Sequence, residues 1–340
     1  MKHKHVLTIN KVSKSNKKYV YDFGNTKNVE IIISANGIQI AAELNKLYDK
    51  NEMISGNVYL FPDAIRKGLL IYLLTYSKGL TIKTVNISID NEKDELVFNN
   101  EPNPPIYSMV NDKLVRSFSL EFTKKPIIDY ILNTPKSGYD RMTSALFSFI
   151  TSKSKLFETE RFIYLWTTFN AMYGFYSKLV RQNLNEKEAK AYNIECNQIK
   201  AFQQMIGVGS ATILKKESRK IANDVIFVLK TYEGNISKKA FENKKLSINI
   251  ESKLTNDDGK KYDLSAYGYL LTQFSYYYRC NIIHGSKPII LFTYSDDTEL
   301  HCLKIINGLL EEFIDEHLPK FFDPDYINNT LIPSTKSIVL

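Results

Sequence analysis

The helical half of this chain is decided by the segment Arg161-Phe162-Ile163-Tyr164-Leu165-Trp166-Thr167-Thr168-Phe169-Asn170-Ala171-Met172-Tyr173-Gly174. Apolar and aromatic side chains recur along it with the period of an α-helix, and the pattern predicts one long helix over Glu158–Gln182. Asn170 is a polar residue on this otherwise apolar helix. Its amide must therefore be hydrogen-bonded.

Around this helix the chain divides into a β-rich part and a helical part. Further helices are expected over Ser137–Thr151, Glu186–Ile206, Ala211–Tyr232, Tyr262–His284 and Glu299–His317. In the earlier part, the sequence pattern predicts a helix over Pro62–Ser77 and strands over Val6–Val12, Tyr19–Phe23, Val29–Ser34, Thr81–Asp90, Leu96–Phe98 and Leu114–Phe122. The expected fold class is α+β, with a mixed β-rich domain over 1–125, a helical domain over 126–318 that includes an exposed loop over 233–261, and an irregular tail over 319–340.

Composition indicates a globular protein with an anionic partner. The 340 residues are 44% hydrophobic and 24% charged, which is ordinary for a globular protein. The net charge of +8 and the pI near 9.0 favour binding to a polyanion such as nucleic acid. The alternative is a proteome rich in lysine, because Lys far outnumbers Arg here.

Cysteine usage and hydropathy predict a cytoplasmic protein. Cys196, Cys280 and Cys302 are too few and too scattered for a disulfide scaffold or a zinc site, so free thiols in a reducing compartment are expected. The N-terminus has no signal-peptide core, and the longest apolar run, Leu69–Leu74, is too short to cross a bilayer. We expect His3 and His5 to lie in a frayed terminus.

The chemistry of the chain is concentrated in Tyr276-Tyr277-Tyr278-Arg279-Cys280-Asn281-Ile282-Ile283-His284-Gly285. Arginine binds phosphate through its charge and planar donors, and histidine exchanges a proton near neutral pH, so together they could cleave RNA without a metal. His284 stands five positions after Arg279, which places the two about 140° apart around a helix. Tyr277, Asn281 and His284 form a stacked polar row on the same helix.

A purely structural interpretation of the same residues stays open. His284 near a helix end would then interact with the negative end of the helix dipole. Arg279 would pair with an acidic residue such as Glu158 or Glu160.

In combination, these two segments resemble the HEPN superfamily, most closely its Apea-like group. Phe169-Asn170-Ala171-Met172-Tyr173 resembles the Phe-Asn-Ala-aromatic signature of the early helix, and Arg279 to His284 fits the motif of an arginine and a histidine four to six residues apart. The resemblance covers roughly residues 138–318. It implies a helical bundle that forms a homodimer, in which two such motifs meet in a shared cleft.

The resemblance also implies an activity. Active HEPN proteins are metal-independent endoribonucleases found in toxin–antitoxin, CRISPR-linked and abortive-infection defence systems, while inactive relatives bind nucleic acid or act as protein partners. Arg279 and His284 would be the catalytic residues, with Asn281 and Tyr277 orienting the histidine or the phosphate. Asn170 would brace the motif helix or line the cleft. Cys280 stands where active members often have Asn, Asp or His, which favours the non-catalytic alternative.

Other patterns are less informative. Lys215, Lys216, Arg219 and Lys220 form a basic patch on a predicted helix, which is either an RNA-binding track or a solvated face. No paired-histidine zinc signature and no phosphate-binding lysine loop occurs, so we expect neither a metal nor a cofactor. The first 125 residues contain no recognisable catalytic group, which suggests a sensor or regulatory domain that meets a trigger or an antitoxin.

Overall fold

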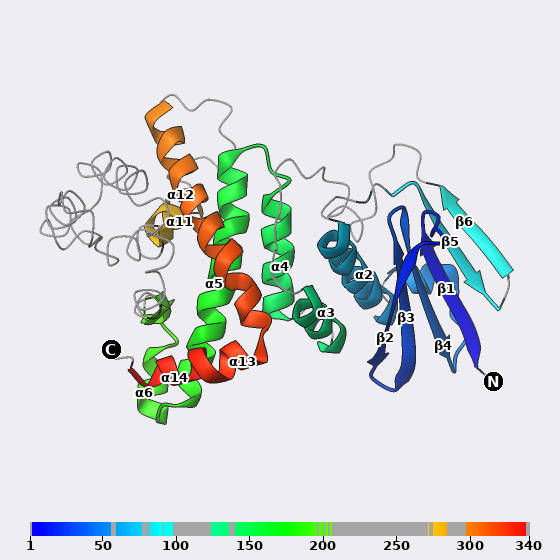
Figure 1. The fold of residues 1–340 in the computed structure, drawn as a ribbon, viewed down its shortest axis with the longest axis horizontal. Coiled ribbons are helices and arrows are strands. Elements are labelled where there is room, and N and C mark those ends of the chain that lie inside the picture. Colours follow the sequence, from blue (N-terminus) through cyan, green and yellow to red (C-terminus); the bar gives the residue numbers. More distant parts are fainter. Residues whose placement is uncertain are drawn as a thin grey trace, which may run out of the picture. The chain divides into compact units, whose positions relative to one another are not determined.

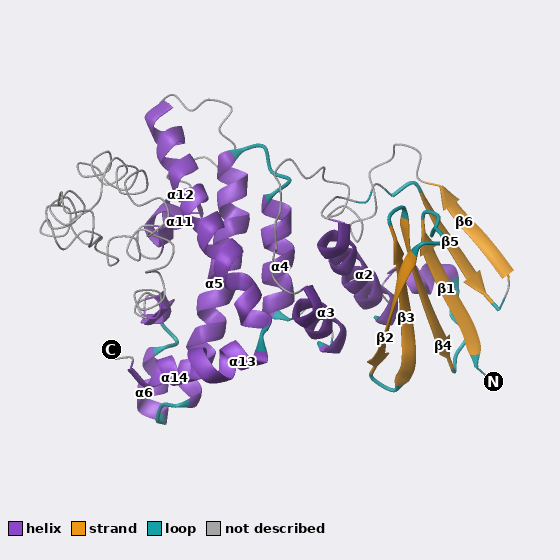
Figure 2. Cartoon of the chain, viewed as in Figure 1, coloured by secondary structure: helices purple, strands orange, loops and turns teal. Residues whose placement is uncertain are grey.

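We describe a computed structural model of the chain, which covers residues 2–55, 59–76, 80, 82–90, 92–97, 124–135, 140–195, 197–199, 201–202, 205, 271, 275–283 and 297–337. Strands occupy the first part and helices the later part, so the fold class is α+β as expected (Figure 2). The chain separates into two compact units, Met1–Ser154 and Lys155–Leu340.

The first unit is built on a six-stranded antiparallel sheet with the strand order β2-β3-β4-β1-β5-β6 (Figure 1). The strands are β1 (His3–Ile9), β2 (Asn16–Phe23), β3 (Thr26–Ser34), β4 (Gly37–Leu44), β5 (Thr84–Ile89) and β6 (Glu92–Val97). Five of these strands overlap predicted ones, whereas β4 was missed. Its signal is the Asn36-Gly37 pair followed by alternating apolar residues, which is typical of a hairpin.

One face of the sheet is buried and the other is open. Successive strand residues point to opposite faces, and Leu7, Ile31 and Ile40 on the buried face are fully inaccessible. Helix α2 (Leu60–Tyr76) packs against β3 and β4. At the closest approach, a Cβ on Gly68 would lie 3.1 Å from Ile38 Cγ2, so the helix packs tightly there because residue 68 has no side chain.

A buried ion pair fixes α2 within the first unit. Asp63 and Lys67 lie one turn apart with Nζ 3.3 Å from Oδ2, and both side chains are at most 1% exposed. Lys67 also donates to the carbonyl of Leu132 at 2.9 Å and lies over the ring of Tyr21. Burial lowers the pKa of Lys67, so its partners are what keep a charge in this place.

The contact with Leu132 also explains where the first unit ends. Helices α1 (Lys50–Ser55), α3 (Lys124–Asn133) and α4 (Arg141–Ser152) all belong to it. The boundary therefore follows Ser154 and not residue 125, because α3 packs on α2 and β2. The side chain of Asp140 caps α4 and accepts a hydrogen bond from Tyr130 of α3, which links these two helices.

The second unit is helical. It contains α5 (Glu158–Gln182), α6 (Glu186–Ala191), α11 (Ser275–Ile283) and α12 (Asp297–His317). The bounds of α5 confirm the prediction, and α12 packs along α5 (Figure 1). The helix expected over Glu186–Ile206 is interrupted, since α6 ends at Ala191.

Short helical turns follow α12. They are η4 (Leu318–Phe322), α13 (Pro324–Tyr326), η5 (Ile327–Leu331), α14 (Ile332–Ser334) and η6 (Thr335–Ser337). Ser334 bonds to Tyr176 of α5, and Thr335 bonds to Asn183, which caps the end of α5. The expected irregular tail is therefore a run of docked turns, because its apolar residues Phe321, Phe322 and Leu331 are buried.

The strand predicted over Leu114–Phe122, the helix over Ala211–Tyr232 and the loop over 233–261 lie outside the described residues. Within the described ranges, no helix combines the length and apolarity needed to cross a membrane.

Candidate functional site

The predicted site residues are only partly within the described structure. Arg279 and Cys280 lie on α11 and are half-buried, and Asn170 is half-buried on α5. Tyr277 and Asn281 also belong to α11, but their side chains are outside the description. His284 and the basic patch of Lys215, Lys216, Arg219 and Lys220 lie outside the described residues altogether.

Aromatic contacts hold α11 against α5. The buried ring of Tyr278 meets Phe162 edge-on at 5.3 Å, and the ring of Tyr276 lies 6.2 Å from that of Trp166. On α5, the ring of Phe169 packs against the rings of Trp166 and Tyr173, which lie one turn before and after it. These packing contacts set which side of α11 faces α5, and therefore what surrounds Arg279.

The guanidinium group of Arg279 is poorly satisfied by its neighbours. Its Nη1 lies 3.8 Å from Cys280 Sγ, a weak acceptor, and its centre lies 5.9 Å from the ring of Tyr276. Its Nε is buried and has no hydrogen-bond partner among the described residues. The same holds for the indole nitrogen of Trp166, whose ring neighbours Tyr276. Both nitrogens are therefore hydrogen-bond donors without an acceptor among the described residues.

The charge of Glu195 acts on Arg279 without an ion pair between these two described residues. Burial opposes the charged form of Arg279, but the contact with Cys280 and the charge of Glu195 outweigh it, so the pKa lies above its ordinary value. Glu195 Oε1 accepts a hydrogen bond of 2.5 Å from the phenol of Tyr173. Burial and Glu195 raise the pKa of Tyr173, which therefore stays protonated and donates.

Tyr276 completes this group. Burial is the main reason that its pKa is raised to about 12, and Cys280 and Glu195 add to the shift. We define Tyr173, Glu195, Tyr276 and Arg279 as the arginine cluster. A guanidinium whose own contacts are a thiol and a ring can bind an anion through its other donors. The pKa values of Tyr173, Tyr276 and Arg279 are all raised, so none of these three groups exchanges a proton near neutral pH.

One expectation about Arg279 needs correction. Glu158, one of the acidic partners expected for it, is buried and pairs with Arg161 at 3.0 Å, and the charge that acts on the pKa of Arg279 is that of Glu195. The ring described near the guanidinium is that of Tyr276, while the side chain of the predicted Tyr277 lies outside the described residues. Glu195 was missed because it falls in the segment after α6, where the expected helix is interrupted.

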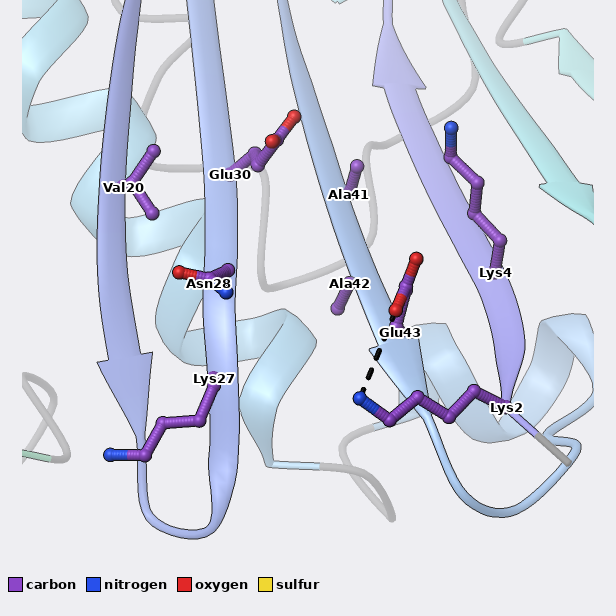
Figure 3. A pocket seen from close by; sticks show the side chains of 9 residues that line it. All are labelled: Lys2, Lys4, Val20, Lys27, Asn28, Glu30, Ala41, Ala42 and Glu43. Atoms are coloured by element: carbon purple, nitrogen blue, oxygen red, sulfur yellow. Dashed lines mark ion pairs between the residues drawn. The ribbon is translucent and has the colours of Figure 1, made fainter.

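The described grooves lie on the open face of the sheet in the first unit. Lys2, Lys4, Lys27, Glu30 and Glu43 are among the residues that line one of about 370 Å³ around Val20 and Ala41 (Figure 3). Lys2 pairs with Glu43 at 3.9 Å, and Glu30 pairs with Lys18 at 2.6 Å. These exposed pairs largely cancel one another, so this groove offers no concentrated charge, unlike the arginine cluster.

A second groove of about 600 Å³ is lined by residues that include Thr8, Gln39 and Asn86 on the same face. Gln39 donates to Thr8 at 3.1 Å. Apart from Lys11, its polar side chains are neutral amides and hydroxyls, and together they provide neither a nucleophile paired with a base nor a set of metal ligands.

The described residues contain no group of three or more metal-ligating side chains. His3 and His5 lie in β1 and not in a frayed terminus. His5 is fully buried, and its ring nitrogens lie 3.1 Å from the carbonyl of His3 and the amide of Tyr48. His3 lies 2.6 Å from Asp90, so both imidazoles are engaged within the strand region.

Comparison with protein-family profiles, with curated proteins and with solved structures found no match to this chain.

Proposed function

We propose that this protein is a metal-independent endoribonuclease of the HEPN type. The observation that carries the proposal is Arg279, whose charge is favoured and whose buried Nε has no partner among the described residues. An arginine in this condition is suited to a phosphate, which accepts several hydrogen bonds. The sequence supplies His284 directly after the end of α11 at Ile283.

In the proposed reaction the 2′-hydroxyl of RNA attacks the adjacent phosphorus, and the bond from phosphorus to the 5′-oxygen breaks. His284 takes the proton of the 2′-hydroxyl as a general base, or gives a proton to the leaving 5′-oxygen as a general acid. The products are a 2′,3′-cyclic phosphate and a free 5′-hydroxyl. Arg279 stabilises the charge that grows on the phosphate oxygens in the transition state.

A homodimer would divide the proton transfers between two copies of His284. Asn281 and Tyr277 would orient the histidine or the phosphate, and Asn170 would brace α11 or line the cleft. Lys215, Lys216, Arg219 and Lys220 would bind the RNA backbone outside the reacting centre. The first unit, with its open sheet face, would act as a sensor for a trigger or an antitoxin in a defence or toxin system.

The test is incubation of the protein with labelled RNA in EDTA. Wild type should produce 2′,3′-cyclic ends, and His284→Ala and Arg279→Ala should lose at least about a hundredfold in rate. The matched controls are His301→Ala on α12 and Arg181→Ala near the end of α5, both of which replace exposed residues of the same types. Cleavage by His284→Ala at the wild-type rate would end the proposal.

The alternative is a non-catalytic HEPN module that binds nucleic acid or a protein. It is favoured by the contact of Arg279 Nη1 with Cys280, which engages part of the guanidinium inside the chain. Under this alternative, wild type binds RNA in a salt-sensitive manner without cleaving it, and Cys280→Asn does not create activity.

A further inference from the structure

Burial along α11 shows which of its described side chains a ligand can reach. Ser275 and Tyr278 are buried, whereas Tyr276, Arg279 and Cys280 are each half-buried. The three half-buried residues are spaced three and four positions apart, so they share one face of the helix. A ligand that reaches the guanidinium of Arg279 therefore also comes close to the ring of Tyr276.

The ring of Tyr276 is anchored to α5 but is not stacked on another ring. It lies 6.2 Å from the ring of Trp166 at an interplanar angle of 47°, which is a tilted contact. Trp166 is itself 3% exposed and packs against Phe169, so this anchor is part of the core. Among the described residues, no ring stacks on the face of Tyr276, and the guanidinium carbon of Arg279 lies 5.9 Å from the centre of the ring.

We propose that Tyr276 stacks on a base of the RNA whose phosphate is bound by Arg279. The proposal rests on the proposed function and adds a nucleobase contact to that site. Single-stranded nucleic acid is commonly bound by a positive charge that holds the backbone and by an aromatic ring on which a base stacks. One face of α11 presents both groups, with the ring and the guanidinium in contact.

The chemistry of Tyr276 suits this contact and indicates the form of the RNA. Burial and Cys280 raise the pKa of the phenol to about 12, so the side chain carries no negative charge that would repel a phosphate. A base inside a duplex is covered by its neighbours, so a stacking contact requires an unpaired strand or loop. Stacking tolerates every base, because each base has a π-face.

The test compares the binding of two 2′-O-methyl RNA strands of equal length, one with its bases and one without any base. Neither strand can react, because the attacking hydroxyl is methylated, and both carry the same phosphates. Wild type should bind the strand with bases about tenfold more tightly, as expected for the stacking of one base. Tyr276→Leu should remove most of this preference, whereas Tyr276→Phe, which keeps the ring, should retain it.

Two further variants separate base stacking from phosphate binding and from a structural role. Arg279→Ala should weaken both strands by the same factor, because a phosphate contact does not depend on the base. Tyr164→Leu on α5 is the matched control, since it removes another half-buried ring with a cation, Lys155 Nζ, at 5.3 Å, and it should change neither affinity. Thermal unfolding confirms that each variant is folded. Equal weakening of both strands by Tyr276→Leu would overturn the inference.

The outcomes separate the inference from the proposed function. If wild type binds the two strands equally well, the stacking role fails, whether or not unmodified RNA is cleaved. If the preference for bases depends on Tyr276 but unmodified RNA is not cleaved in EDTA, the nuclease fails and the base contact belongs to a non-catalytic RNA-binding module. If wild type binds neither strand and cleaves no RNA, both fail.

Discussion

Arg161 and Arg279 belong to the same helical unit and differ in what meets their guanidinium groups. Arg161 is 7% exposed and pairs with Glu158 at 3.0 Å and with Glu311 of α12. Asn307 of α12 donates to the same Glu158 carboxylate at 2.7 Å. Arg279 Nη1 contacts the thiol of Cys280, its guanidinium lies 5.9 Å from the ring of Tyr276, and no described carboxylate forms an ion pair with it.

The comparison separates a structural arginine from a candidate functional one. Two carboxylates surround Arg161 and join α5 to α12, so its hydrogen-bonding capacity serves the fold. Within the described residues, Arg279 forms no such ion pair, and its guanidinium contacts only a thiol and a ring. Residue type alone does not distinguish the two, since both lie on aromatic-rich helices.

The largest expected effect comes from Arg161→Ala. It leaves Glu158 and Glu311 buried without their cation, which should lower the free energy of unfolding by about 3–5 kcal/mol. Arg279→Ala should change it by less than about 1 kcal/mol while abolishing cleavage. Urea unfolding of both variants beside Arg181→Ala measures the difference. Equal destabilisation by the two substitutions would remove the distinction drawn above.

A buried histidine of the same unit, His317, should make the stability of the fold depend on pH. Burial lowers the pKa of His317 to about 3, and Lys320 adds to the effect, so the folded chain keeps this imidazole neutral. The unfolded chain takes up a proton below about pH 6.5, so stability falls as the pH falls from there toward 3. This group should contribute a loss of up to about 3 kcal/mol between pH 7 and pH 4.

Thermal unfolding between pH 7 and pH 4 measures this loss of stability. The groups around the imidazole of His317 are Phe313, Glu316 and Lys320. His317→Gln should flatten the pH profile, whereas the exposed His301→Gln should not. A steep profile that persists in His317→Gln would show that other groups carry it. His317→Gln should also cleave RNA like wild type, because a histidine that stays neutral cannot exchange protons near pH 7.

A smaller effect is expected from Asn307→Ala. The change removes the donor that bonds the buried Glu158 carboxylate and should cost about 1–3 kcal/mol of unfolding free energy. The exposed Asn329→Ala should cost less than about 0.5 kcal/mol. In combination with Arg161→Ala, the loss should not be additive, since both side chains bind one carboxylate. Strict additivity would contradict a shared network.

The smallest expected effect is a gain in stability. Gly308 lies within α12, and a Cβ added there meets no atom within 4 Å. Gly308→Ala should therefore stabilise the helix by about 0.5–1 kcal/mol. In contrast, Gly37→Ala would place its Cβ 2.4 Å from the carbonyl oxygen of Ile9 and should destabilise the sheet. Differential scanning calorimetry of the two variants checks both signs.

Much of the fold was predictable from local patterns. The alternation in Thr84–Ile89 and the helical period in Glu158–Gln182 each depend on residues within a few positions of one another. β4 was missed although its hairpin signal was present, and the domain boundary was placed too early because α3 is defined by its packing on α2. Periodicity identifies elements better than it identifies which elements share a core.

The candidate site was predictable in part. The sequence alone indicated Arg279 and the helix that bears it, because an arginine on an apolar helix needs a polar partner. It also determined the α+β order of the chain. Only the tertiary structure decided that Glu158 of α5 pairs with Arg161 and is bonded by Asn307 of α12, and that Glu195 is bonded by Tyr173. The physical reason is that helical period depends on near neighbours, whereas an ion pair depends on where distant segments pack.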